Sequence, residues 1–348
     1  MEHLELIVLI VSCSSENSQE EGTEETISTV KSSLASPTEN FLFLSDIHLN
    51  ATDSINPTDY GEDTRNNDAL GGDYYAFTNC SGENAFSLDP SGQYPAPNAN
   101  KLYYNDSIYG YYSAKPFDGL RIIALNSVLL GHTYHSDNCH SHNLTPETQL
   151  EAGDHQMSWL KKQLQSADSL KEKVYIMMHI PPGLDAYKTH EYHSDYSMWA
   201  HKHWQDDFLN YVNQYESTIS GIFYGHTHMD ELRLLANSSG GYSEVAFSCP
   251  GITPRSKNNP GFKIVSYNTD MEPTNFTTYF TNLPCTEWGT ASYTFNNIYH
   301  RPDSLSGSIK DWILNMDTNK VENNMKEFYT VSHKKGASWS KLGIKVSY

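Results

Sequence analysis

One stretch of the chain joins an apolar run to a glycine and two histidines: Ile219-Ser220-Gly221-Ile222-Phe223-Tyr224-Gly225-His226-Thr227-His228. The β-branched and aromatic residues predict a buried strand, and the glycine lets the backbone turn where that strand ends. In an extended loop, His226 and His228 point to opposite sides, so the pair can serve two neighbouring metal ions. The alternative is two exposed loop histidines, because short patterns also arise by chance.

Two more apolar runs are followed by side chains of types that commonly bind metals. Residues 41–44 lead to Asp46 and His48, and residues 174–178 lead to His179. In α/β sheets, ligands bind beyond the carboxyl ends of the strands. The three strand ends therefore predict one shared site.

The rest of the pattern alternates strand and helix. We expect a strand over 120–126, a helix over 154–166 and an amphipathic helix that includes Trp204. Residues 244–248 and 262–266 predict two strands in a hairpin-like tail, and helices follow from about residue 308. Residues 49–119 are rich in Gly, Pro, Asn, Asp and Tyr, and predict a long irregular region. The expected fold class is α/β.

Composition limits the choice of partner. The 348 residues suffice for one large domain or two small ones. A net charge of −19, with 23 Lys and Arg, argues against nucleic acid as a partner, because nucleic-acid binding needs a basic face. Sixteen histidines are many for this length, and histidine is the commonest metal ligand.

The N-terminal segment predicts export. Residues 1–13 resemble a secretory or lipoprotein signal with Cys13 after a small residue, although Glu2 and Glu5 stand where such signals carry Lys or Arg. Residues 14–39 are acidic and rich in Ser and Thr, and predict a disordered tether. We expect the main domain over 40–300, a helical extension over 301–348, and the first forty residues outside the fold.

Secretion into the medium or the cell envelope has two further, weaker indications. Four cysteines can form two disulfides in an exported chain, with the pairing left open: Cys80, Cys139, Cys249 and Cys285. Six glycosylation sequons occur, but an Asn-rich chain contains some by chance: Asn50, Asn79, Asn105, Asn143, Asn237 and Asn275.

The candidate metal ligands combine carboxylate, amide and imidazole groups. The set is Asp46, His48, Asn66, His179, His226 and His228. Carboxylate with imidazole suits zinc, manganese or iron. Two such ions can bind both oxygens of an in-line phosphoryl displacement and lower the pKa of a bridging water.

The same residues carry a resemblance to the calcineurin-like metallophosphoesterases. The neighbouring sequence is most similar to the branch of acid sphingomyelinase-like phosphodiesterases, from about residue 40 to the C-terminus with one gap. Five short sequence segments carry this similarity: Tyr60-Gly61-Glu62-Asp63-Thr64, Gly71-Gly72-Asp73-Tyr74-Tyr75, His179-Ile180-Pro181-Pro182-Gly183, Gly225-His226-Thr227-His228-Met229-Asp230-Glu231 and Asn259-Pro260-Gly261-Phe262.

This resemblance implies a four-layer α/β/β/α sandwich with two zinc ions between strand ends. It assigns Asp46, His48 and His228 to the first ion. It assigns Asn66, His179 and His226 to the second ion. It also implies a secreted or envelope-bound hydrolase of phosphodiester or pyrophosphate bonds, acting on sphingomyelin or on nucleotides. A lipid anchor or a lipid substrate would then bring the protein to a membrane surface.

The chain departs from the family in one segment. Only 17 residues, 49–65, separate His48 from Asn66, whereas a strand-helix-strand crossover needs roughly thirty or more. The motif whose aspartate bridges the two metals is therefore absent, and Asn67 stands where many members have the acid histidine. Nearby loop carboxylates are Asp63, Asp68 and Asp73, and each is more readily explained as a solvated loop residue.

No catalytic residue is assigned for this reason. Three functions stay open: a phosphodiesterase that uses metal-activated water, a metal-binding pseudoenzyme of the same fold, and a nucleotide phosphodiesterase or pyrophosphatase.

Two other histidine groups are weaker candidates. His132, His135, His140 and His142 surround Cys139, and a solvated loop explains them better than a further metal site. His190, His193, His201 and His203 lie either at the substrate entrance or on the surface.

Overall fold

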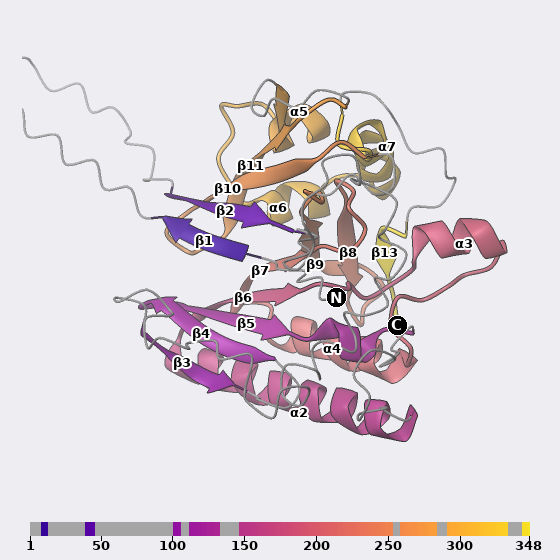
Figure 1. Cartoon of the computed structure of the whole chain (residues 1–348). Helices are drawn as coiled ribbons and strands as arrows, with labels where there is room; N and C mark the ends of the chain where they lie inside the picture. Colours follow the sequence, from indigo (N-terminus) through magenta and orange to yellow (C-terminus); the bar gives the residue numbers. More distant parts are fainter. Residues whose placement is uncertain are drawn as a thin grey trace, which may run out of the picture.

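The computed structural model describes residues 8–12, 39–45, 100–105, 111–132, 146–252, 258–283, 291–332 and 343–348. These residues form a mixed α/β fold with two β-sheets, shown in Figure 1, so the expected α/β class is confirmed. No helix among them is long and apolar enough to cross a bilayer.

The larger sheet has eight strands, and its centre is parallel. In spatial order the strands are β13 (Lys345–Val346), β8 (Leu232–Ala236), β9 (Tyr242–Ser248), β7 (Ile219–Tyr224), β6 (Lys173–Met178), β5 (Leu120–Leu125), β4 (Tyr112–Phe117) and β3 (Asn100–Asn105). Strands β5, β6, β7 and β9 run parallel to one another. Their carboxyl ends therefore meet at one edge of the sheet.

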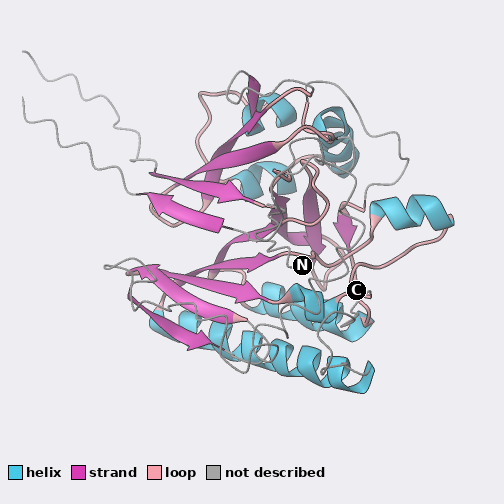
Figure 2. Cartoon of the chain, viewed as in Figure 1, coloured by secondary structure: helices cyan, strands magenta, loops and turns pink. Residues whose placement is uncertain are grey.

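Helices α2 (Pro146–Leu170) and α4 (Lys202–Gln214) lie along one side of this sheet (Figure 2). The crossover from β5 to β6 contains α2 and the crossover from β6 to β7 contains α4, as is usual for connections between parallel strands. Met157, Leu160 and Leu164 on α2 and Trp204 and Phe208 on α4 are buried in one cluster with this face of the sheet. Both helices were predicted, although α2 is longer than the expected 154–166.

The smaller sheet has five strands in the order β1 (Val8–Ser12), β2 (Glu39–Leu44), β10 (Gly261–Tyr267), β11 (Pro273–Phe280) and β12 (Ala291–Thr294). It packs face to face on the other side of the large sheet through aromatic side chains. Phe41 of β2 meets Tyr175 of β6 and Phe223 of β7 at ring-centroid distances of 5.7 and 5.5 Å. The predicted strands at 41–44, 174–178 and 219–224 thus supply this interface.

The C-terminal helices join the core between the sheets. They are α5 (Phe295–Tyr299), α6 (Ile309–Leu314) and α7 (Thr318–Phe328). Ile309, Ile313, Val321, Met325 and Phe328 are buried in the same cluster as Phe41 and Phe223. The helices predicted after about residue 308 are therefore integral to the core.

Three expectations about the elements were wrong. Strands β9 and β10 were expected in one hairpin, but they lie in different sheets: β9 pairs antiparallel with β8, and β10 with β11. Region 49–119 was expected to be irregular, but β3 and β4 form an antiparallel hairpin at the edge of the large sheet. Val8–Ser12 was expected outside the fold, but it pairs with β2 as β1.

Candidate functional site

The candidate site lies where parallel strands end. In the register of the sheet, Leu125 of β5 pairs with Met178 of β6, and Met178 pairs with Tyr224 of β7. His179 follows β6 directly, and Gly225 and His226 follow β7. Parallel pairing thus brings together two segments that lie 47 residues apart in the sequence.

The imidazoles of His179 and His226 are in contact. His226 Nδ1 lies 3.3 Å from His179 Nε2, and the ring planes are nearly perpendicular, at 85°. The backbone supports the contact, since the Gly225 N–H donates to the His179 carbonyl at 3.1 Å. Both side chains are half-buried.

This geometry fits a shared metal ion. Two nitrogen donors at about 2.0–2.1 Å from one tetrahedral zinc are themselves about 3.3 Å apart, which is the separation of these two nitrogens. Among the residues described, no group of three His, Cys, Asp or Glu side chains completes such a site.

The loop that carries His226 and His228 is not extended. Both residues have left-handed backbones, with φ of +71° and +60°. The extended-loop argument made from the sequence was therefore wrong. The two imidazoles nevertheless have different neighbours, because His226 meets His179 while His228 is buried against Gly251.

Gly251 makes room for His228 and also holds the end of β2. A Cβ at Gly251 would lie 2.5 Å from Nδ1 of His228, so only glycine permits this packing. Gly251 forms a parallel bridge with Ser45, and the Ile252 N–H donates to the Ser45 carbonyl at 3.1 Å. The chain thus leaves β2 beside His228. Three of the predicted ligands, Asp46, His48 and Asn66, lie outside the described residues.

Two buried side chains hold the backbone directly after His179 through hydrogen bonds. Ser127 Oγ accepts from the Ile180 N–H at 2.6 Å, and the Trp199 indole donates to the Ile180 carbonyl at 3.0 Å. Ser127 and Trp199 were not singled out in the sequence. Neither a serine nor a tryptophan signals such a role in the sequence by itself.

Two buried ion pairs follow the His226–His228 loop. Asp230 accepts from Lys263 Nζ at 2.6 Å, from Thr278 at 2.8 Å and from Tyr293 at 2.9 Å, which ties the loop to the five-stranded sheet. Glu231 pairs with Arg233 at 3.2 Å. Burial raises the pKa of the Glu231 carboxyl, against the opposing charge of Arg233.

The remaining histidine candidates do not join His179 and His226 in the described structure. His190 and His193 lie at a ring-centroid distance of 6.3 Å in and after α3 (Ala186–Tyr192), and both are exposed. His203 pairs with Asp154 at 2.8 Å on the surface. His135, Cys139, His140 and His142 lie outside the described residues, as do Asp63, Asn67, Asp68 and Asp73.

Comparison with known proteins identifies relatives of this chain. No family model matches. The chain is 34% identical over 184 residues to the mouse cyclic GMP-AMP phosphodiesterase SMPDL3A, which covers 50% of this chain and 38% of the relative. It is 28% identical over 251 residues to sphingomyelin phosphodiesterase B of Dictyostelium discoideum, covering 68% and 35% respectively. It is 29% identical over 186 residues to the mouse acid sphingomyelinase-like phosphodiesterase 3b, covering 50% and 37%.

The matches thus span well under half the length of these curated relatives. They confirm the resemblance seen in the sequence: the chain is a homologue of the acid sphingomyelinase-like phosphodiesterases.

Proposed function

We propose that this protein is a metal-dependent phosphodiesterase. The observation that carries the proposal is the 3.3 Å contact between His179 and His226 at adjacent ends of parallel strands. The relatives named above support it, because each is named as a phosphodiesterase. The mixed two-sheet fold is compatible with the four-layer sandwich that the resemblance implies, and we extend the proposal to that architecture.

The proposed ligand set keeps the assignment made from the sequence. Asp46, His48 and His228 would hold one divalent ion, and Asn66, His179 and His226 the other, with zinc as the first candidate. When bound, such ions polarise a phosphoryl group and lower the pKa of a coordinated water. The protein's own part is to hold the two imidazoles at the separation described, and metal binding would require both rings to be neutral.

We propose a phosphodiester as the substrate. Two of the relatives are named for cyclic GMP-AMP and for sphingomyelin, which share a phosphodiester and differ in what it joins. Export, with the protein in the medium or the cell envelope, also remains a proposal, as does contact with a membrane surface.

A second candidate is a protein of this fold that binds metal without turnover. It is favoured by the short interval between His48 and Asn66, which leaves no place for a strand-helix-strand segment. The described residues also provide no bridging carboxylate beside His179 and His226.

One experiment separates these candidates. Purified protein is incubated with bis-p-nitrophenyl phosphate, cyclic GMP-AMP or sphingomyelin, with Zn²⁺ or Mn²⁺ added, and metal content is measured by elemental analysis. We expect the wild-type protein to hydrolyse the activated ester, bis-p-nitrophenyl phosphate. In His226→Ala the rate should fall by more than about 100-fold, because loss of a residue outside the metal ligands typically costs about 10–100-fold. His190→Ala on α3 is the matched control and should leave the rate unchanged.

Metal binding without hydrolysis of any of the three esters would favour the second candidate. A wild-type protein that binds no metal, or a His226→Ala variant that retains the full rate, would contradict the phosphodiesterase proposal.

A further inference from the structure

One buried side chain contacts both of the loops that carry the candidate site histidines. Arg233 lies on β8, where the apolar sequence Leu232-Arg233-Leu234-Leu235 makes a charged residue unexpected. Its side chain is 1% exposed. Nη1 donates to the Pro182 carbonyl at 2.6 Å, and Nη2 pairs with Glu231 Oε1 at 3.2 Å. Pro182 lies three residues after His179, and Glu231 lies three residues after His228.

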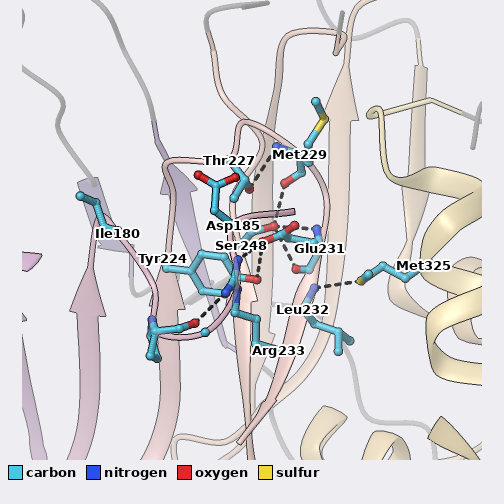
Figure 3. A network of polar contacts seen from close by, with 12 residues as sticks. Ile180, Asp185, Tyr224, Thr227, Met229, Glu231, Leu232, Arg233, Ser248 and Met325 are labelled. Carbon is cyan, nitrogen blue, oxygen red and sulfur yellow. Dashed lines mark hydrogen bonds and ion pairs between the residues drawn. The ribbon is translucent and has the colours of Figure 1, made fainter. Parts of the chain in front are cut away.

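Arg233 also reaches the end of β7. Glu231 Oε1 accepts from the Tyr224 hydroxyl at 3.1 Å, and the guanidinium carbon lies 5.5 Å from the centre of the Tyr224 ring. Tyr224 is the last residue of β7, directly before Gly225 and His226. Figure 3 shows Tyr224, Glu231, Arg233 and Ser248 converging in one network. The guanidinium is thus bound to the segments before and after the His226–His228 loop.

The turn after His179 is shaped around the guanidinium. Gly183 has φ of +100°, a conformation that favours glycine. A Cβ there would lie 2.9 Å from Nη1 of Arg233 and 2.8 Å from Val346. Close packing of this kind leaves the Pro182–Gly183 turn little freedom to move relative to β8.

We propose that Arg233 is a positioning residue that sets the separation of the His179 and His226 imidazoles. The planar fork of arginine holds two acceptors in fixed directions, which lysine cannot reproduce. One loop is held through the Pro182 carbonyl and the other through Glu231. The part of this inference that concerns metal binding rests on the proposed function; the coupling of the two loops does not.

A matched pair of variants tests the inference. Arg233→Lys keeps the charge and removes the fork. The control is Arg121→Lys, because Arg121 is also 1% exposed and pairs with a buried glutamate, Glu172, at 2.6 Å. Glu172 lies before β6 and His179 after it, so the control pair is roughly 20 Å from the site, at about 3.3 Å per strand residue.

The first readout is a titration of each metal-free protein with Zn²⁺ or Mn²⁺ alone. Residues that orient metal ligands typically change affinity 10–100-fold. We expect the Kd of Arg233→Lys to rise by about that factor, and the Kd of Arg121→Lys to stay within about twofold of wild type. An equal rise in both variants would overturn the inference, since a general loss of stability would then explain it.

The second readout needs no metal. The Gly225 amide donates to the His179 carbonyl, so its hydrogen exchange reports whether the two loops remain joined. We expect faster exchange of this amide in Arg233→Lys than in wild type or Arg121→Lys. If Arg233→Lys fails to fold, Gly183→Ala replaces it in the same experiment, because the new Cβ would lie 2.9 Å from Nη1 of Arg233 and displace the guanidinium.

The two readouts distinguish a failure of the proposed function from a failure of the positioning role. If the wild-type protein binds no metal, the proposed function is wrong, and the exchange of Gly225 still decides the role of Arg233. If the wild-type protein binds metal but Arg233→Lys shows unchanged affinity and unchanged exchange, the positioning role is wrong and the proposed function stands.

Discussion

His226 and His228 occupy a backbone conformation that costs energy. Their φ values of +71° and +60° lie in the left-handed region, where each non-glycine residue costs of order 1–3 kcal/mol. Histidine tolerates this region better than most residues. Such strain persists only where the surroundings enforce it, and here they do so through Gly251 and the ion pairs that follow the loop.

The contact between Gly251 and His228 gives a prediction at this scale. In Gly251→Ala, the new Cβ would lie 2.5 Å from Nδ1 and 2.8 Å from Cγ of His228. The ring must move, so we expect metal affinity to fall at least about 10-fold while the protein loses about 1–3 kcal/mol of stability. Titration with Zn²⁺ and urea unfolding measure the two effects.

Gly241→Ala is the control, because its Cβ would have 3.4 Å to the nearest atom, Asn237 Nδ2. Unchanged metal affinity in Gly251→Ala would show that His228 does not contribute a ligand.

At the scale of elements, α2 and α4 pack closely at Gly153. A Cβ there would lie 2.2 Å from the rigid indole of Trp204 on α4. Alanine normally favours a helix over glycine by about 1 kcal/mol, but overpacking costs about 1–3 kcal/mol or more. We therefore expect Gly153→Ala to lower the free energy of unfolding measured in urea.

Gln165→Ala is the control, because Gln165 lies on the exposed side of α2. This variant should change the free energy of unfolding by less than about 0.5 kcal/mol. A Gly153→Ala protein that is more stable than wild type would contradict the close packing at Gly153.

A buried carboxyl on β9 predicts how stability depends on pH. Glu244 accepts from the Val245 N–H at 2.9 Å and pairs with Lys310 on α6 at 3.0 Å. Burial raises the pKa of Glu244 from 4.5 to about 7, although Lys310 acts in the opposite direction. Between these values the folded state holds a proton that the unfolded state has lost, so this group makes stability fall as pH rises from about 4.5 to about 7.

In Glu244→Gln this fall should disappear. Relative to the variant, wild type is expected to lose on the order of 2–3 kcal/mol between pH 4.5 and pH 8. Urea unfolding of both proteins at several pH values measures it. Parallel curves for the two proteins would mean that folding does not shift the pKa of Glu244.

The sequence predicted elements best where local pattern and burial agree. The runs 41–44, 174–178 and 219–224 are short and mostly apolar, most of their side chains are buried, and each forms the expected strand. The pairing of β9 with β8, and of β10 with β11, depends on partners elsewhere in the chain and could not be read from local pattern. The edge strand β3 and its neighbour β4 lack a clear alternation, and their place in the sheet comes from their pairing with each other and from the pairing of β4 with β5.

At the scale of the whole molecule, the short interval between His48 and Asn66 leads to a prediction of which esters are cleaved. General acid catalysis contributes about 10²–10⁴-fold, and the resemblance places Asn67 where many family members have the acid histidine. We therefore expect esters with acidic leaving groups to react much faster than unactivated ones. A plot of log kcat/KM against leaving-group pKa should fall steeply, and a flat plot would show that another residue donates the proton.

The candidate site was only partly predictable at this scale. His179 and His226 were found because each follows an apolar run, and parallel pairing brings such ends together. Arg233, Gly251 and Ser127 were missed, because their roles come from contacts with segments distant in the sequence. The charge of Arg233 within an apolar strand was the one signal that pointed to it.

The pairing of β2 with β10 has a consequence for how the chain folds. Phe43 pairs with Lys263, so the two paired positions are 220 residues apart in the sequence (263 − 43). At about 5–20 residues per second, synthesis separates them by roughly 10–40 s. During that time β2 lacks its neighbour and exposes Phe41 and Phe43, and non-local pairings of this kind fold slowly. A nascent chain of this protein should therefore bind chaperones until β10 emerges, and replacing Phe43 with a polar residue should weaken that binding as well as the folded core.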